Sequence, residues 1–111
     1  MSVTIGDPRI MLPEKIGKDA VISVRALITH PMYTGLSRDA QGRPIPAHFI
    51  DRVVVQYGGE EVARFEWTSG ISRDPFVAFP LRATREAPLT ITWHDNAGAT
   101  FRQSVDVRFS A

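Results

Sequence analysis

The sequence predicts an all-β protein, an immunoglobulin-like antiparallel β-sandwich of about seven strands. Apolar and polar residues alternate with a period of two through seven short runs. Turn-forming residues separate these runs at intervals of about 8 to 12 residues, which is typical of a sandwich. Apolar residues follow the helical spacing nowhere along the chain. The 111 residues fit a single domain covering 1–111.

The first two expected strands precede a long irregular segment. Residues 9–12 form a short apolar run closed by Pro13, which favours an edge strand because proline cannot donate to a neighbouring strand. Residues 20–29 are rich in β-branched side chains and contain neither glycine nor proline. Their apolar side chains fall on one face: Ile22, Val24, Ala26 and Ile28.

The second half of the chain alternates in the same way. The expected strands cover residues 50–57, 60–67, 76–83, 89–95 and 101–109. Gly58-Gly59 between the first two is the dipeptide that a two-residue hairpin turn requires. Pro80 indicates that its strand lies at a sheet edge or contains a bulge.

The long segment from Thr29 to Phe49 is the least regular part of the sequence. It contains three prolines and two glycines, and a connection of about 20 residues in a compact domain is usually functional or disordered. Its apolar side chains favour an ordered loop that carries a recognition surface. The residues expected at a partner interface are His30, Met32, Tyr33, Leu36 and Ile45.

Composition and charge exclude several classes of partner. The net charge is +1 and the 13 basic residues are spread along the chain, which argues against binding to nucleic acid or to an anionic membrane surface. No apolar run approaches the length of about 18 residues that a membrane-spanning helix needs. The chain has no cysteine, which excludes disulfides, thiol catalysis and thiolate metal sites. The first 15 residues show no pattern of a signal peptide.

Two pairs of residues are candidates for chemistry. His30 and Met32 could form half of a copper site, since imidazole and thioether both suit copper. Thioether ligands normally occur in sets, however, so a structural role for both residues is favoured. His94 and Asp95 could form an oriented general base, but neighbours in a strand point to opposite faces. We therefore expect no catalytic residue, no cofactor and no resident metal.

Several motifs in a fixed order resemble the SoxZ family. They are P-R-I-M-L-P at 8–13, T-H-P-M-Y-T-G at 29–35, V-V-V-Q-Y-G-G-E-E-V at 53–62, D-P-F-V-A-F-P-L-R-A-T at 74–84 and L-T-I-T-W-H-D-N-A-G at 89–98. The resemblance covers essentially the whole chain. It implies an immunoglobulin-like sandwich that forms a heterodimer with SoxY, whose cysteine carries covalent sulfur intermediates between the Sox enzymes of thiosulfate oxidation.

The same resemblance implies a cysteine-free, non-catalytic subunit, in agreement with the composition. It also implies a periplasmic location, reached by export together with a partner that carries the signal. The expected contacts are a SoxY-like cysteine-bearing subunit and, transiently, the Sox enzymes. An alternative from another class is a periplasmic copper-binding β-sandwich protein that uses His30 and Met32.

Overall fold

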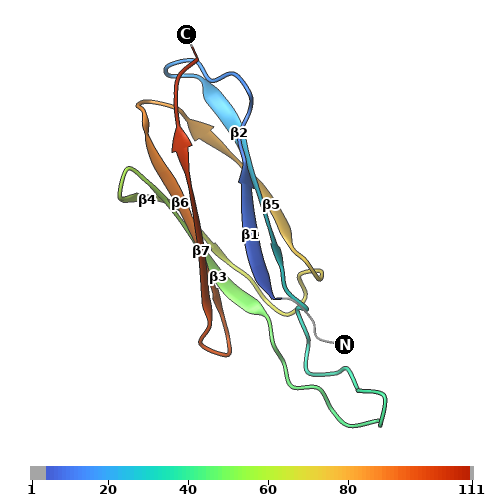
Figure 1. Cartoon of the computed structure of the whole chain (residues 1–111). Coiled ribbons are helices and arrows are strands. Elements are labelled where there is room, and N and C mark those ends of the chain that lie inside the picture. The colour runs from blue at the N-terminus through green and yellow to red at the C-terminus, as the bar shows by residue number, and fades with distance from the viewer. Residues whose placement is uncertain (1–4, 111) are drawn as a thin grey trace.

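The computed structural model describes residues 5–110 and consists of seven strands in two antiparallel sheets (Figure 1). One sheet has the order β1-β2-β5, formed by β1 (Gly6–Met11), β2 (Val21–Thr29) and β5 (Phe76–Arg82). The other has the order β4-β3-β6-β7, formed by β4 (Glu60–Glu66), β3 (Ile50–Tyr57), β6 (Ala87–Asp95) and β7 (Thr100–Val107). The expected fold class is confirmed.

The core lies between the two sheets and is built from the strand faces that alternation predicted. The four apolar residues of β2 named above are all buried. Val53 and Val55 of β3 and Ile91 and Trp93 of β6 oppose them from the other sheet and are fully buried. The period of two therefore identified the inward faces correctly, because one face of each sheet packs against the other sheet.

Strand ends agree with the expectation or differ from it by up to three residues. The largest difference is in β1, which begins at Gly6 rather than at residue 9 because Gly6 pairs with Thr29 of β2. The register shifts between Gly6 and Arg9, and Asp7 has a left-handed φ of 49°. This irregularity lies around Pro8 and interrupts the alternation of apolar and polar residues, so the sequence pattern did not reveal that the strand begins at Gly6.

Turn chemistry and edge positions agree with the sequence. Gly58 and Gly59 connect β3 to β4 with φ values of 59° and 87°, the left-handed pair that a tight hairpin turn needs. Pro80 lies in β5, which is an edge strand of its sheet. Within residues 5–110, no helix is long and apolar enough to cross a membrane.

Candidate functional site

Residues 31–49, called the ribbon from here on, connect β2 to β3 and project beyond the end of the sandwich (Figure 1). Near its base, the Tyr33 amide donates to the His48 carbonyl at 2.7 Å and the His48 amide donates to the Tyr33 carbonyl at 3.0 Å. Farther out, the Ile45 amide donates to the Ser37 carbonyl at 2.8 Å. The two arms of the segment therefore run antiparallel and are held by their own backbone.

The tip of the ribbon is closed by Asp39. Its Oδ1 accepts the amide hydrogens of Gln41 and Arg43, each at 2.9 Å. The Arg38 guanidinium donates to the Gly42 carbonyl at 2.9 Å. An aspartate that satisfies the amides of the following residues is a common way to stabilise a tight turn. The tip is thus structured although it makes no contact with the core.

The five residues expected at a partner interface divide into two groups. His30 and Met32 are only 0% and 5% exposed and lie inside the protein, so they support the ribbon from below. Leu36 is 88% exposed on the ribbon, and Tyr33 and Ile45 are half-buried beside it. Only these last three present side chains at the surface, and their contact with a partner stays a prediction.

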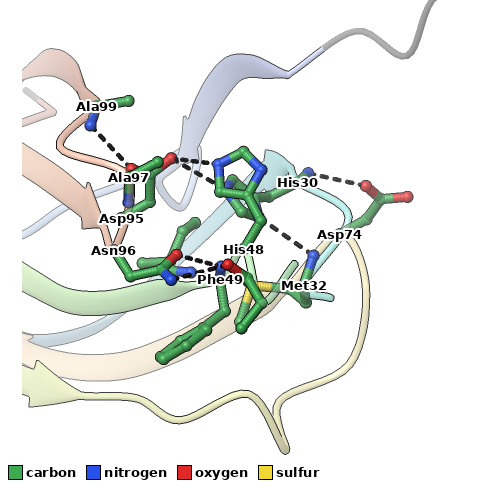
Figure 2. Close-up of polar contacts among 11 residues, drawn as sticks. His30, Met32, His48, Phe49, Asp74, Asp95, Asn96, Ala97 and Ala99 are labelled. Atoms are coloured by element: carbon green, nitrogen blue, oxygen red, sulfur yellow. Dashed lines mark hydrogen bonds and ion pairs between the residues drawn. The ribbon is translucent and has the colours of Figure 1, made fainter. Parts of the chain in front are cut away.

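A buried group of three side chains, called the histidine–aspartate cluster, lies at the base of the ribbon (Figure 2). His30 follows β2, His48 lies on the returning arm of the ribbon, and Asp95 ends β6. The Oδ2 atom of Asp95 lies 3.3 Å from Nε2 of His30 and 2.9 Å from Nε2 of His48. The two imidazole rings meet edge to face with centroids 4.5 Å apart.

The second carboxylate oxygen of Asp95 is also fully used. Its Oδ1 accepts the amide hydrogens of Ala97 at 3.0 Å and Ala99 at 2.8 Å, within the turn between β6 and β7. Burial alone would raise the pKa of Asp95, but the hydrogen bonds from Ala99, His48 and His30 outweigh it and hold the pKa below its ordinary value. Asp95 is therefore an ionised carboxylate that joins the ribbon to this turn.

Hydrogen bonding determines which nitrogen of His30 carries the proton. Its Nδ1 accepts the amide hydrogen of Met32 at 3.2 Å, so the proton of the neutral ring lies on Nε2, which donates to Asp95. Burial lowers the pKa of His30, the bond to Asp95 acts in the opposite direction, and nearby His48 lowers it further. Neutral His30 has both ring nitrogens satisfied.

The same three side chains have the spacing of a possible metal site, since their ligand atoms all lie within 4.8 Å of one another. A histidine that ligates a metal normally donates its other ring N–H to an acceptor. The Nδ1 atom of His30 meets the opposite partner, the donating amide of Met32. The sulfur of Met32 accepts the amide hydrogen of Ile50 at 3.3 Å. The geometry therefore favours a structural cluster over a metal site, and it gives no support to a copper pair of His30 and Met32.

Two further side chains extend this cluster. Asp74, in the connection before β5, accepts the His30 amide hydrogen at 3.0 Å, and its own amide donates to the His30 carbonyl at 2.9 Å. Asn96 accepts the Phe49 amide hydrogen at 2.8 Å and donates to the Ala47 carbonyl at 2.9 Å (Figure 2). Two separate segments, the connection before β5 and the turn after β6, are thus connected to the two ends of the ribbon.

The sequence did not connect His48 or Asn96 with Asp95, and Asp95 was considered only together with its neighbour His94. Asp95 is buried and His94 faces the other side of the sheet, as expected for adjacent strand residues. Two motifs of the resemblance nevertheless contain members of the cluster: T-H-P-M-Y-T-G contains His30, and D-N-A-G contains Asp95 and Asn96. Neither motif reveals by itself that the other is its contact.

These observations define a seven-stranded β-sandwich domain with an ordered projecting ribbon and a cluster at its base whose ring nitrogens and carboxylate oxygens serve structure. The chain belongs to the SoxZ family, described as sulphur oxidation protein SoxZ, which it matches over residues 10–106. The resemblance stated from the motifs is confirmed. The family is that of a non-catalytic subunit of the Sox sulfur-oxidation system.

Several solved structures share the fold at low sequence identity. A superoxide reductase (neelaredoxin) from Ignicoccus hospitalis has a TM-score of 0.69 and 18% identity, covering 96% of this chain and 82% of its own. The sulfur carrier protein SoxY from Chlorobium limicola f thiosulfatophilum has a TM-score of 0.63 and 17% identity, covering 94% and 79%. No curated protein matches the chain in sequence. Because the same sandwich fold occurs in a reductase and in a carrier, these similarities support the fold of this chain but not a function. The function has to be argued from the family and from the site.

Proposed function

We propose that this chain is the non-catalytic partner subunit of a SoxYZ-type carrier complex in thiosulfate oxidation. It binds a SoxY-like subunit whose cysteine carries covalent sulfur intermediates from one Sox enzyme to the next. The observation that carries the proposal is the family match over residues 10–106 of a chain without cysteine. Persulfide or thiosulfonate attachment needs a thiolate, so the covalent chemistry belongs to the partner.

In this proposal the ribbon serves as a docking element of the assembled carrier. Its exposed Leu36, with Tyr33 and Ile45 beside it, supplies apolar surface on a segment ordered by its own backbone bonds. Because the histidine–aspartate cluster holds the base, little conformational freedom remains to be lost on binding. The ribbon contacts either the SoxY-like subunit or, transiently, the Sox enzymes.

The proposed location is the periplasm, where the carriers of this family work. The chain reaches it together with the partner, whose signal exports the heterodimer. Separation of the cell into periplasm and cytoplasm, followed by detection of this chain with and without the partner, tests the location. Its presence in the periplasm should depend on the partner's signal.

The function itself is tested by intact-mass spectrometry of the complex purified from cells and turned over with thiosulfate and the Sox enzymes. Sulfur-containing mass increments should accumulate on the cysteine-bearing partner, while this chain keeps its mass throughout. Reductant should remove the increments from the partner. A covalent sulfur increment on this chain, or purification without any cysteine-bearing subunit, contradicts the proposal.

A further inference from the structure

The outward faces of the two sheets differ in chemical character. An antiparallel sheet that covers a core with one face normally presents polar side chains on the other. The four-stranded sheet mostly does so, with Val54 and the exposed Val62 as apolar exceptions. Its outward polar positions include Arg52, Gln56, Arg64, Thr90, His94, Arg102, Ser104 and Asp106. The three-stranded sheet departs from this pattern.

Strand β5 is apolar on both faces. Val77, Phe79 and Leu81 point toward the core, and the intervening residues Phe76, Ala78 and Pro80 point outward. Phe76 is 56% exposed, a large aromatic side chain facing solvent in the described part of the chain. A strand that is apolar throughout its length is typical of a position covered on both sides. The core covers one face of β5, so a cover for its other face would have to come from outside this domain.

The strand register gathers the outward apolar side chains into one surface. Phe76 lies opposite Leu27, Ala78 opposite Arg25, and Pro80 opposite Ser23 on β2. On the far side of β2, Met11 of β1 lies opposite Arg25. We call this surface the apolar face and define it by its apolar members Met11, Val21, Leu27, Phe76, Ala78 and Pro80.

Two shallow hollows indent the apolar face on either side of Ser23. One is lined by Met11, Leu12, Pro13, Ser23 and Arg25. The other is lined by Val21, Ile22, Ser23, Ala78, Phe79 and Pro80. Both hollows include the small residue Ser23, and the second also includes Ala78. Hollows of this kind receive the apolar side chains that dominate the energy of protein–protein interfaces.

The charges on the apolar face disfavour a second copy of this chain as the occupant. Neither β2 nor β5 contains an acidic residue, and their charged side chains are Arg25 and Arg82. Arg9 of β1 lies on the same face opposite Leu27 and pairs with Asp7 of its own strand at 3.2 Å. A two-fold dimer with its axis near Arg25 would bring arginine against arginine, and such like-charge contacts are unfavourable. A fitting partner carries carboxylates at these positions.

The size of the apolar face suits the centre of a stable interface. Three strands of six to nine residues, at about 3.3 Å per residue and about 4.8 Å between strands, give a flat footprint of roughly 300 to 400 Å². This footprint covers the whole face of the sheet, its arginines and Ser23 included, and the apolar members occupy part of it. A heterodimer of standard size buries about 800 Å² on each side, so the relief of the side chains and the segments beside the sheet would contribute the rest.

We propose that the apolar face is the binding surface for the cysteine-bearing partner subunit. The partner covers it with apolar side chains and places aspartate or glutamate against Arg25 and Arg82. This inference rests on the proposed function and assigns the partner to one sheet of the sandwich. The ribbon begins after β2, beyond the end of this face, and stays available to the enzymes that meet the assembled carrier.

The experiment measures the dissociation constant between this chain and its cysteine-bearing partner for two variants of the apolar face. Phe76→Glu replaces the exposed aromatic side chain with a carboxylate, and Ala78→Glu places a carboxylate opposite Arg25, where it occupies the arginine intended for the partner. Each should weaken binding at least about 30-fold, the effect of losing one interface hot spot. Matched controls on the polar outward face of the other sheet are Gln56→Glu and Ser104→Glu, which should bind within about threefold of the wild type. Circular dichroism and thermal melting confirm that all four variants fold.

Charge reversal adds an independent arm to the experiment. Arg25→Glu should weaken the complex, and raising the salt concentration should weaken the wild-type complex more than that of the variant. Unchanged binding by folded Phe76→Glu and Ala78→Glu overturns the inference and leaves the proposed function intact. Self-association of the isolated chain that Phe76→Glu abolishes assigns the face to a second copy and also overturns it. A wild-type chain that binds no cysteine-bearing subunit refutes the proposed function, and the inference with it.

Discussion

Replacement of Asp95 by asparagine tests the histidine–aspartate cluster with almost no change of shape. The carboxylate accepts two hydrogen bonds from the imidazoles and two from the amides of Ala97 and Ala99. An amide has one oxygen and one NH₂ group, so one orientation of Asn turns a donor toward the donating amides of Ala97 and Ala99. The other orientation turns the donor toward the N–H of His30 and toward His48, which can accept only by taking its other tautomer. His30 cannot turn its ring to compensate, because its Nδ1 already accepts the Met32 amide hydrogen.

The expected loss follows from these contacts. A hydrogen bond to a charged acceptor contributes about 1.5 to 3 kcal/mol, and a buried donor left without a partner costs about 1 to 3 kcal/mol. In the less costly orientation the bond from His30 is lost, its N–H is left unpaired, and the bond to His48 is weakened. The side chain of His48 is 27% exposed, so water replaces part of its bond. We expect Asp95→Asn to lower the free energy of unfolding by about 3 to 4 kcal/mol, a large part of the roughly 5 to 15 kcal/mol of a typical domain.

The assay is urea unfolding of the isolated chain at neutral pH, followed by tryptophan fluorescence. With a slope near 2 kcal/mol per molar, typical of a small domain, the midpoint should fall by about 1.5 to 2 M. The matched control is Asp106→Asn on β7, whose carboxylate is exposed and pairs with Arg108 at 3.2 Å. That change should stay within about 0.5 kcal/mol of the wild type. A loss below about 1 kcal/mol in Asp95→Asn would refute this account of the cluster.

Three further predictions concern acid, the ribbon and metals. The pKa values of His30 and Asp95 are both lowered in the fold, so the unfolded state binds more protons than the folded state. The urea midpoint should therefore fall as the pH drops through the ordinary pKa of histidine, about 6.5, and again through that of aspartate, about 3.9. A midpoint that rises on acidification contradicts the assigned protonation. Leu36→Asp should leave thermal stability unchanged within about 0.5 kcal/mol, because the side chain is exposed, while enzyme turnover by the assembled carrier falls at least about tenfold. Gln41→Asp at the ribbon tip is the control, and equal turnover by the two variants would make the ribbon a structural cap. Calorimetry with Cu(I), Cu(II) and Zn(II) should find no stoichiometric site, because the Nδ1 of His30 accepts the Met32 amide hydrogen and cannot be the N–H that a metal-bound histidine normally donates. Tight binding that His30→Ala abolishes would show instead that the cluster is a metal site.

The fold could be predicted because its determinants are local. Each strand of the sandwich has one face in the core, so alternation over a few residues identifies both the strand and its inward side, as in β2. The prediction failed at the start of β1, where the shift of register around Pro8 breaks the alternation. Strand pairing order was not predicted, because nothing local specifies which strands become neighbours.

The cluster could not be predicted for the opposite reason. Its contacts join Asp95 to His48 and His30, which are 47 and 65 residues away in sequence. A sequence pattern indicates contacts only between residues that are close in sequence, such as His30 with Met32 or Asp95 with His94. Strand geometry separates the second pair, since neighbouring side chains point to opposite faces. The apolar character of outward Phe76 and Ala78 was visible in the sequence, but it acquired meaning only when pairing placed them beside Leu27 and Arg25.

The dual role of the Asp95 carboxylate has a consequence for how such chains can diverge. One oxygen serves the ribbon base and the other serves the turn between β6 and β7, so the two segments share a single residue. Asn96 doubles the connection by binding the backbone of Ala47 and Phe49. A ribbon transplanted from a relative would keep its attachment to the sandwich only if the matching turn were transplanted with it. The two segments therefore act as one structural unit, in which a substitution in either segment restricts which residues the other accepts.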